Sequence, residues 1–116
     1  MTLTGYSREG NAKLSAKYLL RAAELGDDKA IVAVGKNLRR GLNGFEKDSV
    51  RAFAWFLEAS KQSNDEGLLE IADLLLTSAP TDQIPPDPKA AQEYLRRVTD
   101  SQHQSRVDEL QRLFKE

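Results

Sequence analysis

The sequence predicts an all-α protein in which about six antiparallel helices form three stacked pairs. Three ten-residue blocks, which begin at Leu14, Arg51 and Lys89, repeat after 37 and then 38 residues. Large apolar residues recur within each block at i, i+4 and i+7 or i+8, which places them on one face of a helix. No segment alternates polar and apolar residues with a period of two, so we expect no strands.

Helix start signals divide the chain into elements. The predicted helices span 11–25, 28–41, 49–62, 65–78, 88–99 and 103–115. Four of them follow a residue that can cap the first free amides, namely Asp27 or Asp28, Asp48, Asn64 and Asp87. All four prolines lie between Pro80 and Pro88, so 79–86 is expected to be an irregular loop. We therefore expect an N-terminal segment at 1–10 and one helical domain at 11–116.

Small and aromatic residues indicate how the helices pack. Gly35 and Gly67 lie within apolar helical stripes, and small side chains there let two helix axes approach closely. Phe56, Trp55 and its counterpart Tyr18 are expected in the core, although an exposed aromatic residue is also a typical interface hot spot. The last helix departs from the repeat, as a terminal capping helix does. Its apolar face carries Val107, Leu110, Leu113 and Phe114, and its solvated side carries Arg106, Glu109, Arg112 and Lys115.

Composition and charge exclude several functions. Lys and Arg number 17 against 18 Asp and Glu, so the net charge is −1 and neither nucleic acid nor a membrane is expected as a partner. The absence of cysteine excludes disulfides, thiolate metal sites and cysteine nucleophiles. The only histidine, His103, has no second ligand at metal-binding spacing and is expected to be exposed. The chain start lacks a secretory signal, so we expect a cytoplasmic, non-enzymatic protein with no cofactor and no metal.

Several short motifs follow one family pattern. They are Ala22-Ala23-Glu24-Leu25-Gly26, Val34-Gly35, the run from Arg51-Ala52 through Trp55-Phe56 to Ala59-Ser60, and the loop from Gly41 to Gly44 that ends at Asp48. Over about residues 12–105 the chain resembles the Sel-one-like repeat family of tetratricopeptide-like helix pairs. The resemblance implies a short right-handed α-solenoid that is a protein-binding scaffold, with the first helix of each pair on the concave surface. We call the first helix of each family repeat first-type and the second helix second-type. In that order this array begins with a second-type helix and ends with a first-type helix.

Charges are segregated between two equivalent helices. Helix 28–41 carries Lys29, Lys36, Arg39 and Arg40 against Asp28, whereas helix 65–78 carries only the acids Asp65, Glu66, Glu70 and Asp73. An apolar residue lies one turn before a charge in each helix, as a partner-binding groove requires. The expected partner-binding residues are Val32, Lys36, Arg39, Arg40, Leu69, Glu70 and Asp73. Two alternatives stay open: the two charged strips pair with each other, and the two apolar residues are half-buried by neighbouring helices.

Three functional hypotheses follow. The leading one is a non-enzymatic adaptor or regulator that binds a protein partner on the concave face. A more specific version is an immunity protein that inhibits a bacterial toxin. The expected partner is therefore a protein, either a toxin or an enzyme encoded nearby. A hydrolase using the carboxylates of Glu66, Glu70 and Asp73 is the third, and it requires their pKa values to be separated. The chain is expected to be a monomer or a weak homodimer.

Overall fold

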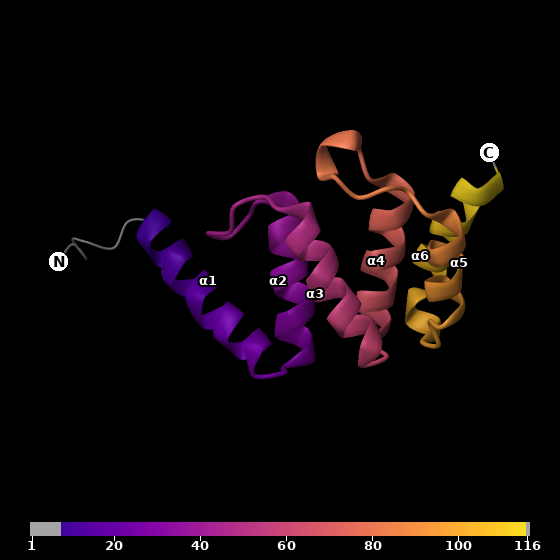
Figure 1. Cartoon of the computed structure of the whole chain (residues 1–116). Helices are drawn as coiled ribbons and strands as arrows, with labels where there is room; N and C mark the ends of the chain where they lie inside the picture. Colours follow the sequence, from indigo (N-terminus) through magenta and orange to yellow (C-terminus); the bar gives the residue numbers. More distant parts are fainter. Residues whose placement is uncertain (1–7, 116) are drawn as a thin grey trace.

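The computed structural model describes residues 8–115 and contains helices but no strands in that range (Figure 1). The α-helices are α1 (Arg8–Glu24), α2 (Asp28–Arg40), α3 (Ser49–Lys61), α4 (Asp65–Thr77), α5 (Pro88–Arg96) and α6 (Gln104–Gln111). Three short 3-10 helices, η1 (Pro80–Asp82), η2 (Ser101–His103) and η3 (Arg112–Lys115), lie between or after them. None of the helices in the described range is long and apolar enough to cross a membrane. The all-α prediction is confirmed.

Side-chain caps explain where four of the helices begin. The side-chain oxygens of the residues before α2, α3, α4 and α5 each accept a hydrogen bond from a backbone amide three residues later, which would otherwise be unpaired. The pairs are Asp27 with Ala30 at 3.1 Å, Asp48 with Arg51 at 3.0 Å, Asn64 with Gly67 at 2.9 Å and Asp87 with Ala90 at 3.1 Å. The predicted caps are therefore confirmed, and Asp27 rather than Asp28 caps α2.

Helices α1 to α5 stack in chain order, with α6 beside α4, in an elongated body of 56 × 29 × 23 Å (Figure 1). Consecutive helices from α1 to α5 pack on each other, and α6 packs on α4. Phe56 of α3 is fully buried and lies against Gly35 of α2, where an added Cβ would come within 2.5 Å of the ring. Gly67 of α4 meets Ala59 of α3 in the same way. The expected close approach of helix axes at small residues is present at both helix contacts.

The C-terminal elements are shorter than predicted. Helix α5 ends at Arg96 rather than 99, because the Asp65 carboxylate accepts from the amides of Thr99 and Asp100 at 3.2 and 2.7 Å and takes the chain out of helical conformation. Helix α6 has only eight residues between two 3-10 turns. Leu113 is 43% exposed rather than buried. The side chain of Phe114 lies outside the described residues, as does the 1–7 part of the predicted N-terminal segment, whereas α1 already begins at Arg8.

The expectation that Tyr18 is a core residue is wrong. Its side chain is 67% exposed, whereas its counterpart Trp55 is half-buried beside Ala23 and Gly26 at the end of α1. The difference arises because α3 has a helix pair before it in the stack. In the described part of the chain, α1 has none. A repeated sequence position therefore has a different environment where no described helix pair precedes it.

The loop before α5 is tied to α3 by one carboxylate. Asp82 accepts from the Ser49 hydroxyl and from the Ala79 amide, both at 2.7 Å. The Ser49 hydrogen bond, and then that of Ala79, lower the pKa of Asp82 below its ordinary value. A lowered folded-state pKa stabilises the fold at pH values above the unfolded pKa of about 3.9, and this contribution is lost as the pH falls through the folded pKa.

We expect Ser49→Ala to destabilise the protein at pH 7 and to have a smaller effect as the pH falls below about 4. Urea unfolding of both proteins across that range measures the difference, and an NMR titration of the Asp82 carboxyl reports its pKa. A difference in stability that stays constant down to pH 2 would contradict this account. Ser78→Ala is a suitable control, because its hydroxyl donates to the Ile84 carbonyl in the same loop without touching Asp82.

Candidate polar site on the first-type helices

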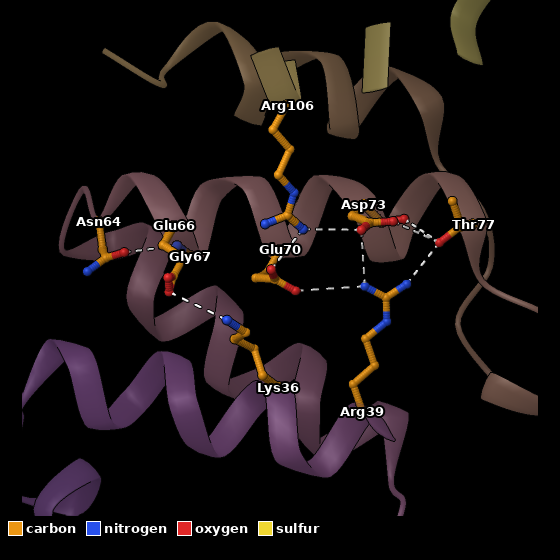
Figure 2. A network of polar contacts seen from close by, with 9 residues as sticks. All are labelled: Lys36, Arg39, Asn64, Glu66, Gly67, Glu70, Asp73, Thr77 and Arg106. Atoms are coloured by element: carbon orange, nitrogen blue, oxygen red, sulfur yellow. Dashed lines mark hydrogen bonds and ion pairs between the residues drawn. The ribbon is translucent and has the colours of Figure 1, made fainter. Parts of the chain in front are cut away.

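The predicted basic and acidic helices, α2 and α4, lie side by side, and α6 packs on the other flank of α4 (Figure 2). Lys36 and Arg39 project from α2 toward α4, and Arg106 projects from α6 toward the same helix (Figure 2). We call the surface formed by α2, α4 and α6 the first-helix face, because these three helices hold the first-type position in the repeat order. Most charges predicted to bind a partner converge on it.

Glu70 lies at the centre of this network and is only 3% exposed. One carboxylate oxygen is 2.8 Å from an Arg106 guanidinium nitrogen, and the other is 3.9 Å from Arg39. Cations from two different helices therefore neutralise one buried acid. Such an arrangement balances the desolvation of the charges and links α2, α4 and α6.

Asp73, one helical turn after Glu70, extends the network. Its carboxylate lies 3.5 Å from Arg39 and 3.3 Å from Arg106. Thr77 accepts from Arg39 at 2.9 Å and donates to the Asp73 backbone carbonyl at 2.8 Å. At the other end of the face, Lys36 and Glu66 are 3.8 Å apart, and both side chains remain about two-fifths exposed, at 41% and 42%. The basic and acidic strips therefore pair with each other, which is one of the two alternatives left open by the sequence.

The sequence pattern does not predict that Arg106 belongs to this network, because the pattern assigns Arg106 to the solvated side of the last helix. Burial on its own lowers the pKa of Arg106, but the carboxylates of Glu70 and then Asp73 outweigh that effect and raise it. The signal was present in the repeat: Arg106 occupies the position of Ile31 and Leu68, which are buried in the preceding first-type helices. A cation at a core-equivalent position requires a partner, and Glu70 provides it.

The expectation that Val32 and Leu69 offer apolar surface to a partner is wrong. Leu69 is fully buried and Val32 is 2% exposed, because neighbouring helices cover both side chains. Glu70 is closed off as well, since its carboxylate lies between two arginines. These three residues offer a partner almost no surface. Arg39 and Asp73 keep 21% and 25% of their side chains exposed, within the network.

Three basic residues of α2 are exposed or partly exposed. Lys29, Lys36 and Arg40 are spaced by seven and four residues, so they form one ridge along the helix. Lys29 and Arg40 are exposed and take part in no ion pair of the described residues. Lys29, at the start of this ridge, lines a hollow of about 610 Å³ at the start of α2 and α4, whose lining also includes Val32 and the acids Asp28, Asp65, Glu66 and Asp100. His103, expected to be exposed, is half-buried at the edge of this hollow.

The arrangement does not resemble a catalytic centre. Glu66, Glu70 and Asp73 each lie within ion-pair distance of Lys36, Arg39 or Arg106, which suits an interhelical contact rather than proton transfer to a substrate. Within residues 8–115, no group of three or more His, Asp and Glu side chains is placed to hold a metal ion. The contacts therefore favour a structural clamp beside an open charged ridge.

The stacked helix pairs, the close contacts at small residues and the charged face define a helical-repeat protein of the solenoid class. The Sel1 repeat family model matches residues 1–27, 28–64 and 66–101, and the chain belongs to this family. The second match covers α2 and α3, and the third covers α4 and α5, so each of these matches is one helix pair. Sel1 repeat proteins are generally protein-interaction modules.

A solved Sel1 repeat protein from Oxalobacter formigenes has a similar structure, with a TM-score of 0.67 and 26% sequence identity. The match covers 83% of this chain and 39% of the other chain. This chain therefore corresponds to less than half of the length of that protein. A comparison with curated proteins gave no match.

Proposed function

We propose that the protein is an interaction module that binds a protein partner on the first-helix face. The observation that carries this proposal is the basic ridge on α2, with Lys29 and Arg40 exposed and Lys36 between them partly exposed, whose first residue lines the hollow at the start of α2 and α4. The hollow receives a partner side chain, and the ridge attracts carboxylates. Arg39, Glu70, Asp73 and Arg106 hold the three helices in register beneath this surface.

Charge at such a rim acts mainly on the association rate and on the choice of partner. We expect the double reversal Lys29→Glu with Arg40→Glu to weaken partner binding roughly tenfold at low salt and less at high salt. Both residues are exposed and lie outside the buried network, so the melting temperature should change little. The partner is first identified by affinity capture with the wild-type chain from its source cells. Calorimetry with the captured partner then gives the affinity of each variant.

A matched control is available on the second-type helices. Arg51 of α3 and Lys89 of α5 are also exposed, and their reversal to Glu changes the net charge by the same amount. The control pair should bind the partner as the wild type does. If both double variants bind with wild-type affinity, the binding surface lies elsewhere. If both bind equally more weakly than the wild type, only the net charge matters.

The adaptor and immunity hypotheses share this surface and differ in the partner. A captured toxin, or a toxin-like reading frame directly upstream, favours an immunity protein. A captured enzyme or receptor favours an adaptor. The charge-reversal experiment has the same expected result in both cases.

A further inference from the structure

Helix α1 carries a second apolar stripe that faces away from the rest of the stack. Leu14, Tyr18 and Leu25 are 44%, 67% and 76% exposed. Leu25 directly follows the last residue of α1, and its amide donates to the Arg21 carbonyl at 3.0 Å, so the helical spacing continues to it. The three residues are spaced by four and then seven positions, which places them on one face. The opposite face of α1 packs on α2 through residues such as Ala23, which is 2% exposed. A helix that is apolar on two faces is typically covered on both.

A further repeat stacked in register accounts for only part of this stripe: it would cover Tyr18, as Trp55 is half-buried on α3, but not the two leucines. On α3, which has a helix pair before it, the positions equivalent to Leu14 and Leu25 are Arg51 and Gln62, and both are exposed. A preceding helix pair would thus leave these two leucines in water. The far end of the stack differs as well, because the exposed residues of α6 include the acids Asp108 and Glu109. A head-to-tail contact between α1 and α6 would therefore set leucines against charges.

The charges beside the stripe are self-complementary for an antiparallel contact. Lys13, Lys17 and Glu24 are exposed and spaced by four and seven residues, so they share one flank of the stripe. When two α1 helices pair about a two-fold axis with Leu14 opposite Leu25 of the other copy, Glu24 lies between Lys13 and Lys17 of that copy. Two-fold pairs bring identical flanks together, so this charge match occurs twice.

The same register also matches the centre of the stripe. Tyr18 lies opposite Arg21 of the other copy, which allows the guanidinium to stack on the aromatic ring. We infer that α1 is a homodimerisation helix that pairs antiparallel with α1 of a second copy through Leu14, Tyr18 and Leu25. A contact of one helix from each copy is at the small end of specific interfaces, so the dimer is weak and depends on concentration.

Sedimentation equilibrium of the full chain tests the dimer. We expect the average mass to rise from the 13.0 kDa of one chain toward twice that value between about 10 μM and 1 mM. Tyr18→Glu places an acid in the centre of the stripe and should keep the mass at 13.0 kDa throughout. A wild-type chain that stays at 13.0 kDa up to 1 mM would overturn the inference.

A charge swap tests the proposed register. Lys17→Glu and Glu24→Lys each replace an attraction by a repulsion at two symmetric places, so each should weaken the dimer roughly tenfold. The double variant restores the attraction between positions 17 and 24 at both places but leaves Lys13 beside a lysine, so it should bind more tightly than either single variant and recover part of the wild-type dimerisation. Failure of the double variant to recover, with helicity by circular dichroism unchanged, would contradict the antiparallel pairing.

Disulfide trapping tests the orientation, because the natural sequence has no cysteine. A mixture of Leu14→Cys and Leu25→Cys chains should form a mixed disulfide. Neither variant should form one with itself, because the same position in the two copies is offset by eleven residues, or about 16 Å along the helix. If two Leu14→Cys chains form a disulfide with each other as fast as the mixed disulfide forms, the antiparallel orientation is wrong. Partner binding on the first-helix face should be unchanged in all of these variants, so the two proposals fail separately.

Discussion

Replacing Arg39 and Arg106 together by alanine is expected to lower the free energy of unfolding by about 3 kcal/mol. The double variant leaves Glu70, which is 3% exposed, without either cation in its network. A buried carboxylate without a compensating charge is strongly destabilising. We expect the lower part of the range typical of buried pairs, because 36% of the Arg106 side chain is exposed and water screens that contact. Urea denaturation followed by circular dichroism measures the change.

A third substitution separates the charge effect from the loss of packing. Adding Glu70→Leu to the double variant removes the uncompensated acid, and an apolar residue of similar size suits a buried position. The triple variant should therefore recover most of the lost stability. A triple variant that is as unstable as the double variant would show that the arginines act through their aliphatic stems and not through Glu70.

Phe56→Ala is expected to destabilise the protein by about 3–5 kcal/mol, which is a large part of the stability of a domain of this size. Phe56 has no exposed surface and fills the contact between α2 and α3 against Gly35. Its removal leaves a cavity that two helix backbones close only partly. Thermal and urea unfolding both report the effect, and Phe53→Ala, at a half-buried position of the same helix, should cost less.

The contact between Phe56 and Gly35 also predicts that the effect of Gly35→Ala on stability changes sign when the Phe56 ring is removed. In the wild type, Gly35→Ala brings a methyl group within 2.5 Å of the Phe56 ring, so it should destabilise although alanine favours helix over glycine by about 1 kcal/mol. In the Phe56→Ala background the ring is absent, and Gly35→Ala should become stabilising. The same sign in both backgrounds would contradict the close packing of α2 on α3.

The local features of the fold could be predicted from the sequence. Helical spacing in the three blocks and the caps at Asp48, Asn64 and Asp87 depend on residues within a turn or two of each other, so they can be identified along the chain. The end of α5 could not, because it depends on the Asp65 carboxylate from an earlier helix. Tyr18 shows the same limit, since its exposure depends on which helices pack beside α1, and no described helix pair precedes it.

The candidate site was predicted in outline and not in detail. Charge segregation between 28–41 and 65–78 correctly placed Lys36, Arg39 and Asp73 on one face. The sequence alone did not show that these charges pair across helices, since ion pairing depends on the orientation of α2 against α4. Burial of Glu70 depends on Arg106, which lies 36 residues later and reaches α4 from a different helix.

The claim that the first-helix face binds a protein partner is tested most directly by site-specific photocrosslinking. A photoreactive amino acid is placed either at Lys29, on the open ridge beside the hollow, or at Gln92, an exposed position on the second-type helix α5. We expect the Lys29 position to crosslink to the captured partner and the Gln92 position to give no adduct. Crosslinking from Gln92 with none from Lys29 would show that the partner binds the opposite helices, and the assignment of the first-helix face would then be wrong.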